Sequence, residues 1–255
     1  MSTIEEVALT KVPQITLSFW IIKILATTVG ETGGDALSMT MDLGYAISSA
    51  IFFLLFLITI AAQITAKSFY PFLYWTVIIT TTTFGTTMAD FADRSLGIGY
   101  VGGSMILFTV LMIVLIMWRF FLGFISVDNI TSPKVEIFYW MTILFSQTLG
   151  TAFGDFMADS SGLGYKGSAF VFAAALTLVA ILYFRTKIST TLLFWIAFIL
   201  TRPLGATVGD LLTKPFASGG LHLNRISSSI IILMMMIGCI LLVGRRAGSH
   251  TNNFK

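Results

Sequence analysis

Acidic residues recur at one position of a repeated sequence pattern. Four segments are each centred on a tryptophan, and each carries an aspartate fifteen residues after that tryptophan. These aspartates are Asp35, Asp90, Asp155 and Asp210. A carboxylate within an apolar segment is costly unless it faces a protein interior or a water-filled cavity. The spacing therefore predicts one common site to which every segment contributes an acid, and such a site suits a cation.

The first segment carries a second acid beside its aspartate. Glu31 precedes Asp35 by four residues, which places both side chains on one face of a helix. Two carboxylates this close in a low dielectric cannot both stay ionised without a counter-charge, so one should bind a proton or a metal. Lys23 and Arg202 lie at similar depth in their segments, and either is an alternative source of that positive charge.

The types of residue available restrict the kind of metal. The only histidines are His222 and His250, and both lie outside the apolar segments, which argues against an imidazole site for zinc or copper. Oxygen ligands favour Mg, Ca or Mn. The predicted metal ligands are Asp35, Asp90, Asp155 and Asp210, with Glu31, Asp93 and Asp159 as auxiliaries. No resident cofactor is expected, because a divalent cation here would be cargo.

The aspartates belong to a longer template that occurs four times. Glycine follows each tryptophan after ten residues, and a second glycine follows each aspartate after nine, with tyrosine next to it in the first three copies. That second glycine is expected to begin another helix. The repeats span 15–66, 70–122, 135–185 and 190–245. Fixed offsets of this kind indicate internal repetition, with two helices in each unit.

Composition places these helices in a membrane. Of the 255 residues, 56% are hydrophobic and 11% are charged, which is too few charges for an ordinary water-exposed surface. Eight apolar stretches have the length of a membrane span: 15–36, 45–65, 72–92, 101–121, 137–157, 166–184, 191–212 and 226–244. The fold class is therefore an all-α integral membrane protein with a single membrane domain over 1–255. Because each unit has two spans, the repeats are parallel, with pseudo-symmetry about the membrane normal.

Basic residues indicate the orientation of the helices. Nine of them fall at the ends of the chain or in the even-numbered connections: Lys11, Lys67, Arg119, Lys134, Arg185, Lys187, Arg245, Arg246 and Lys255. The odd-numbered connections hold four: Arg94, Lys166, Lys214 and Arg225. This bias predicts that both termini are cytoplasmic. The acidic N-terminus does not resemble a cleaved signal peptide, and the single Cys239 excludes an internal disulfide.

With the Trp, Gly and Asp positions in place, residues 19 to 244 resemble a known family. It is a bacterial membrane-protein family of unknown function, built from four tandem two-helix repeats with a characteristic Trp and often described as membrane-anchored proteins. The resemblance implies the fold and an inner-membrane location, and it implies no activity. The fourth unit departs most from the pattern, with Arg202, Pro203 and Lys214.

Two functions from different classes fit these residues. The first is a transporter of a small cation, a divalent metal such as Mn, with proton-coupled efflux as one form. The second is a non-transporting scaffold or signalling protein whose polar motifs hold the bundle together or end its helices. Channel and enzyme interpretations are weaker, because no filter recurs and no catalytic motif is present. The expected partners are the lipid bilayer and the cation, not nucleic acid, and the oligomeric state stays open.

Overall fold

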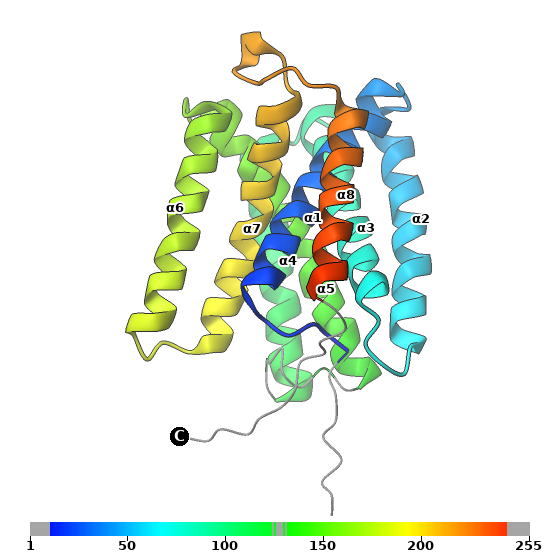
Figure 1. Ribbon diagram of the computed structural model, residues 1–255, viewed down its shortest axis with the longest axis vertical. Coiled ribbons are helices and arrows are strands. Elements are labelled where there is room, and N and C mark those ends of the chain that lie inside the picture. The colour runs from blue at the N-terminus through cyan, green and yellow to red at the C-terminus, as the bar shows by residue number, and fades with distance from the viewer. Residues whose placement is uncertain (1–10, 124, 126–129, 131, 244–255) are drawn as a thin grey trace, which may run out of the picture.

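The computed structural model describes residues 11–123, 125, 130 and 132–243, and these residues are helical almost throughout (Figure 1). The α-helices are α1 (Leu17–Asp35), α2 (Gly44–Thr65), α3 (Pro71–Asp90), α4 (Gly99–Leu122), α5 (Pro133–Asp155), α6 (Gly164–Arg185), α7 (Thr190–Thr213) and α8 (Arg225–Val243). The eight helices expected from the sequence are thus confirmed as helices. His250, Arg245, Arg246 and Lys255, which were used in the sequence argument, lie outside the described residues.

Local sequence explains several helix boundaries. Pro71 and Pro133 occupy the first position of α3 and α5, where the missing N–H is not needed. Ser132 and Ser189 precede α5 and α7 and accept hydrogen bonds from the first turn of each helix. At its far end α4 stops at Gly123, which adopts the left-handed conformation.

The first three repeats continue as helix past their aspartate and beyond the ends of the apolar stretches at 36, 92 and 157. Short π-helices follow α1, α3 and α5: η1 (Ala36–Thr40), η2 (Phe91–Ser95) and η3 (Phe156–Ser160). The N–H of Met41 bonds to the carbonyl of Ala36, which satisfies a backbone group that a break would have exposed. Gly44, Gly99 and Gly164 then begin α2, α4 and α6 at positive φ, as the template predicts.

The fourth repeat departs from this pattern. No π-helix follows α7; Lys214 is extended and leads to a short 3-10 turn, η4 (Phe216–Ser218). Backbone N–H groups of Leu221 and Leu223 bond back to the last turn of α7. The connection from 214 to 224 therefore folds against the end of α7, and Gly219 lies in this connection instead of starting a helix.

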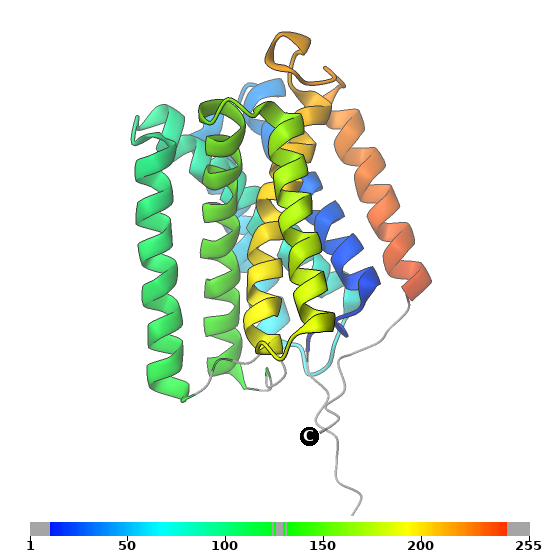
Figure 2. The ribbon, with the colours of Figure 1, turned by 90° about the vertical axis from the view of Figure 1, so that its left-hand side faces the viewer.

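The first helices of the repeats form the centre of the molecule. α1, α3, α5 and α7 pack side by side in a closed ring, in which α7 contacts α1. The connections that follow these four helices lie at the upper end in Figures 1 and 2, whereas the last turns of α2, α4 and α6 lie at the lower end. The four inner helices are therefore parallel to one another.

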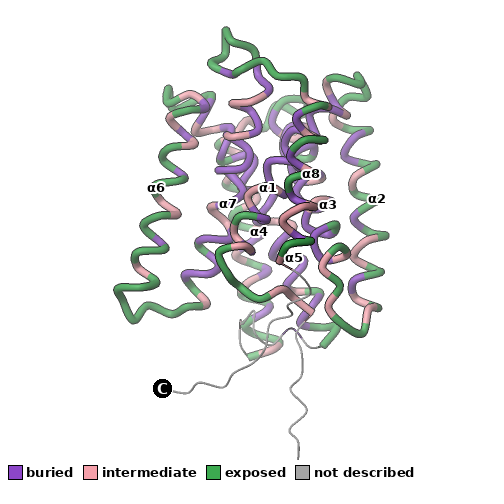
Figure 3. Tube along the Cα trace, viewed as in Figure 1, coloured by how far each residue is buried: buried purple, intermediate pink, exposed green. Residues whose placement is uncertain are grey.

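Each outer helix packs on the next repeat and not mainly on its own. α2 packs on α3, α4 on α5, α6 on α7, and α8 closes the circle on α1. Figure 3 shows that burial is concentrated in the inner helices, while α2 and α6 are mostly exposed. The last helix of the chain, α8, thus covers the first inner helix, α1.

Glycine allows the inner helices to approach closely. The template glycine ten residues after each Trp faces the next helix of the ring in the same sense: Gly30 faces Thr82, Gly85 faces Thr148, Gly150 faces Arg202 and Gly205 faces Thr27. A Cβ atom on Gly30 would lie 2.2 Å from Thr82 Cγ2, and one on Gly205 would lie 2.1 Å from Thr27 Oγ1. The repeated glycine is thus a contact residue of the ring.

The outer surface is apolar, and the polar residues are inside. Large apolar side chains cover the free faces of the outer helices, with Phe120, Phe184 and Leu242 each at least 80% exposed. Among the residues that the structure describes, five helices are long and apolar enough to cross a membrane: α2, α4, α6, α7 and α8. The inner helices α1 and α3 instead carry buried threonines and carboxylates, which lower their hydropathy.

Candidate functional site

Residues spaced four apart on the inner helices line the centre of the ring. They stand one residue before each Trp and three, seven, eleven and fifteen residues after it, and all are buried. Contacts between neighbouring inner helices join matched positions: the hydroxyls of Tyr74 and Tyr139 are 2.7 Å apart, and Lys23 Nζ lies 4.1 Å from the centre of the Phe198 ring. The repeat therefore places equivalent side chains in layers along the axis.

The side chain of Arg202 extends into the layer of side chains that contains Glu31. Its guanidinium Nη2 lies 2.8 Å from Glu31 Oε2 and also donates to the hydroxyls of Thr86 and Thr151. Glu31, Thr86 and Thr151 occupy the same template position in the first three repeats, and Ala206 is the small residue of the fourth. One basic side chain from the fourth repeat is thus bonded to all three of the others.

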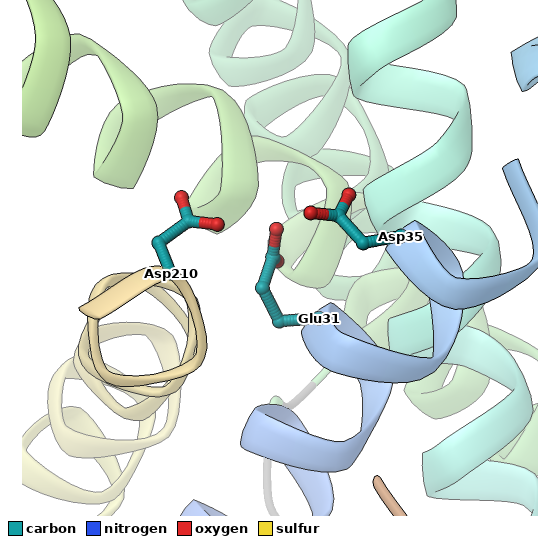
Figure 4. A group of neighbouring side chains, drawn as sticks. All are labelled: Glu31, Asp35 and Asp210. Atoms are coloured by element: carbon teal, nitrogen blue, oxygen red, sulfur yellow. The ribbon is translucent and has the colours of Figure 1, made fainter. Parts of the chain in front are cut away.

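The α1 and α7 side of the ring holds three convergent carboxylates (Figure 4). Glu31 and Asp35 from α1 and Asp210 from α7 each contribute an oxygen, and these oxygens lie within 4.8 Å of one another. Lys214 joins two of them, with its Nζ 2.9 Å from Asp35 Oδ2 and 3.1 Å from Asp210 Oδ1. Arg225 Nε lies 3.5 Å from Asp35 Oδ2. A basic group therefore already balances part of this cluster.

The opposite side of the ring is arranged around Arg94. Its Nε lies 2.8 Å from Asp90 Oδ1, and its Nη2 lies 3.7 Å from Asp155 Oδ2 and 3.9 Å from Asp159 Oδ2. Asp159 also accepts hydrogen bonds from the hydroxyls of Tyr100 and Tyr165. The four template aspartates are consequently divided into two pairs, one bridged by Arg94 and one by Lys214.

For the ionisable residues that follow the inner α-helices, burial and neighbouring charges shift the side-chain pKa in opposite directions. Burial lowers the pKa of Lys214, but Asp210 and Asp35 more than offset it, so the pKa lies well above its usual value and the amine stays charged. Burial raises the pKa of Asp93 by more than Arg94 lowers it. The Asp93 carboxylate lies against Gly103 of α4, away from the three convergent acids.

Acids outnumber bases in this region. Glu31, Asp35, Asp90, Asp155 and Asp210 are all buried, and within the described part of the chain the basic groups less than 4 Å from them are Arg94, Arg202, Lys214 and Arg225. Asp93 and Asp159 add two further carboxyl groups to the same end of the bundle. Oxygens Oδ1 of Asp35 and both oxygens of Asp93 have no hydrogen-bond partner among the described residues. The surplus favours protons or a hard cation, because unpaired carboxylates are costly when buried.

Comparison with known proteins identifies the repeat. The family described as Repeat of Unknown Function (DUF347) matches the chain four times, over residues 18–69, 73–122, 138–189 and 193–248. The chain belongs to the DUF347 family. This confirms the resemblance drawn from the Trp, Gly and Asp positions. A search of curated proteins and a search of solved structures returned no match.

The DUF347 repeats bring together some of the predicted residues and separate others. Asp35, Asp210 and Glu31 converge on one side of the ring, whereas Asp90 and Asp155 pair through Arg94 on the other side. Asp159 lies at the half-exposed rim and Asp93 faces α4. Of the two basic residues considered from the sequence, Arg202 pairs with Glu31, while Lys23 lies over an aromatic ring and contacts no carboxylate of the described residues.

Sequence reasoning missed the two bridging cations. Arg94 and Lys214 stand four residues after Asp90 and Asp210, at one shared DUF347 position that Met39 and Asp159 occupy in the other repeats. Extending the aligned template to four residues beyond each aspartate places Arg94 and Lys214 at this shared position. Thr86 and Thr151 were also missed, although they share the template position of Glu31.

Proposed function

We propose that the protein is a membrane transporter that moves a divalent cation through a site formed by Glu31, Asp35 and Asp210. The observation that carries the proposal is the convergence of three buried carboxylates from two repeats, whose oxygens lie within 4.8 Å of one another. Asp90 and Asp155, with Asp93 and Asp159, supply further negative charge at the same end of the ring.

The donor set fits a hard cation. Calcium binds oxygens at about 2.3–2.6 Å, so ligands on opposite sides of the ion are roughly 4.8 Å apart. Manganese and magnesium require slightly shorter spacing and share the preference for oxygen. The three carboxylates therefore need only a small movement to hold one such ion, and neighbouring threonine hydroxyls can complete its coordination.

Lys214 supplies the resident counter-charge in this proposal. Its ammonium bridges Asp35 and Asp210, so a divalent cation enters only when that group leaves or the carboxylates give up protons. Lys214 lies in the connection after α7 and not on the inner helix itself. Binding of a cation would thus be coupled to displacement of the Lys214 side chain or to proton release, which is the requirement for exchange.

All eight helices cross the membrane in this proposal. The three inner helices that lack sufficient hydropathy, α1, α3 and α5, are enclosed by others, so their polar faces need not meet lipid. The outer helices present apolar side chains to the bilayer. The setting is the bacterial inner membrane, with the repeats arranged about an axis along the membrane normal.

The start of α1 and the end of α8 lie on the cytoplasmic side. Lys67, Arg119 and Arg185 lie in or beside the connections at that same end, as positive-inside topology requires. With Cys239→Ser as background, Lys67→Cys and Lys166→Cys place one thiol at each end of the bundle. An impermeant maleimide applied to intact cells should label the Lys166→Cys protein and not the Lys67→Cys protein; the reverse pattern contradicts the orientation.

Transport is tested with purified protein in proteoliposomes. Mn²⁺ or Ca²⁺ should raise the thermal unfolding midpoint of the full-length protein, because ligand binding stabilises the folded state by mass action. Asp210→Asn should abolish both this stabilisation and cation uptake. The matched control is Asp42→Asn, an exposed acid in the first outer connection. If Asp210→Asn leaves uptake unchanged, the proposed site is wrong.

The ion pairs also support the scaffold as a second candidate. Arg202 joins α7 to α1, Lys214 joins the end of α7 to α1, and Arg94 joins η2 to α5. Each links two repeats and would hold the ring together without transport. In that case Asp210→Asn lowers the unfolding midpoint, and no divalent cation shifts the midpoint of the unmodified protein.

A further inference from the structure

One or two turns before the carboxylates, each of the four inner helices contributes one buried polar side chain whose hydrogen-bonding groups are not all paired within the protein. They are Lys23 from α1, Thr82 from α3, Gln147 from α5 and Arg202 from α7, and each is 0% exposed. Lys23 Nζ, Thr82 Oγ1, both amide atoms of Gln147 and atoms Nε and Nη1 of Arg202 have no hydrogen-bond partner among the described residues.

The repeat places these side chains in adjoining layers. Thr82, Gln147 and Arg202 occupy the same template position, seven residues after the Trp of their repeats. Lys23 stands one turn earlier on α1, and its ammonium lies over the ring of Phe198, which is one turn before Arg202 on α7. The equivalent residue on α1 is Thr27, which is bonded to backbone carbonyls. The four groups therefore lie around one short section of the axis.

The cluster has an excess of donors and of positive charge. Lysine and the free edge of the guanidinium provide only donors, and the Gln147 amide and the Thr82 hydroxyl add more. Glu31 is the carboxylate paired with Arg202, through Nη2, and Lys23 has no carboxylate within ion-pair distance among the described residues. Ordered water can satisfy Gln147 and Thr82, but water does not balance a buried charge.

We propose that Lys23, Arg202, Gln147 and Thr82 bind one small monovalent anion of the halide class. One negative charge balances the ammonium that has no carboxylate, and a halide accepts hydrogen bonds from all four donors. A divalent oxyanion such as sulfate would bring more negative charge than the single unpaired ammonium balances. This site adjoins the carboxylates through Arg202, which pairs with Glu31, but it does not depend on cation transport.

The test uses the full-length protein purified in a chloride-free gluconate buffer. Sodium chloride or bromide, added at constant ionic strength, should raise the thermal unfolding midpoint along a saturating curve, whereas sodium sulfate should not. Gln147→Leu and the isosteric Thr82→Val should each weaken the apparent halide affinity by about tenfold. Lys23→Met should abolish the response, and Lys166→Gln, at an exposed position, should leave it unchanged.

Anomalous scattering from bromide-soaked crystals locates the ion independently of stability. Density between Lys23 and Arg202 is the expected result. If Lys23→Met does not fold, the apparent halide affinities of Gln147→Leu and Thr82→Val still test the proposal. The proposal is overturned if chloride and gluconate give the same unfolding midpoint, if both variants keep the halide affinity of the unmodified protein, or if bromide binds only elsewhere.

Discussion

At the scale of single residues, Lys214 occupies the place of the proposed cargo. Its Nζ contacts carboxylates of α1 and α7, whose neighbour Glu31 is already bonded to Arg202. Lys214→Gln should therefore destabilise the cation-free protein by about 3–5 kcal/mol, as removal of one partner of a buried ion pair does. It should also strengthen divalent cation binding, because a competitor inside the site is gone.

Both effects are measured by thermal unfolding with and without Mn²⁺. The stabilisation by Mn²⁺ should be larger in Lys214→Gln than in the unmodified protein. Lys166→Gln makes the same change of charge at an exposed position of the same end and should show neither effect. A variant that loses stability but gains no response to Mn²⁺ would mean that Lys214 serves the fold alone.

The acids of this site could be predicted from the sequence, but their partners could not. Fixed spacing from Trp to Asp places Asp35 and Asp210 at one depth, so their proximity follows once the repeats form a ring. Which cation bridges which pair depends on side chains that differ between repeats, as Arg94 and Lys214 do. A pattern built on what the repeats share cannot reveal interactions made by what distinguishes them.

At the scale of elements, the packing of α1 on α3 depends on Gly30. Its missing Cβ leaves room for Thr82, so Gly30→Ala forces the two helices apart or moves the threonine. Overpacking of this kind costs about 1–3 kcal/mol. Gly33→Ala on the same helix is the matched control, because nothing lies within 4 Å of the added Cβ. That change should be neutral or stabilising by up to about 1 kcal/mol, owing to the better helix propensity of alanine.

Chemical or thermal unfolding in detergent distinguishes the two glycines. The expected order of stability is Gly33→Ala, then the unmodified protein, then Gly30→Ala. Equal loss of stability in both variants would show that the glycines act through helix flexibility and not through a close contact.

Apolar segments in the sequence predicted the helices but not how some of them end. Hydrophobic length indicates that a helix exists near 72–92, yet the π-helix after Asp90 is made of backbone bonds that any residues could form. In the fourth repeat, by contrast, the sequence did indicate that the helix ends differently. Loss of the tyrosine beside Gly219 indicated a departure, and the chain indeed folds back there instead of forming a π-helix.

At the scale of the whole molecule, the fold is a ring of interlocked repeats. Parallel units could be inferred from the even number of helices in each repeat. The packing of each outer helix on the next repeat could not, because the short connections permit either neighbour. As a result, no repeat buries its own inner helix, and α8 of the last repeat covers α1 of the first.

Closure of the ring predicts how the protein behaves when it is divided. Residues 1–122 and 123–255, expressed as two chains, separate the second repeat from the third and leave the contacts of α4 with α5, α3 with α5 and α1 with α7 and α8 to form between chains. Each half alone exposes buried acids and threonines, and the first half lacks Arg202 to balance Glu31. Co-expressed halves should therefore co-purify as a one-to-one complex with the Mn²⁺ response of the intact protein, while either half alone should aggregate or be degraded. Size-exclusion chromatography in detergent measures this, and a first half that is monodisperse and stable by itself would contradict the interlocked ring.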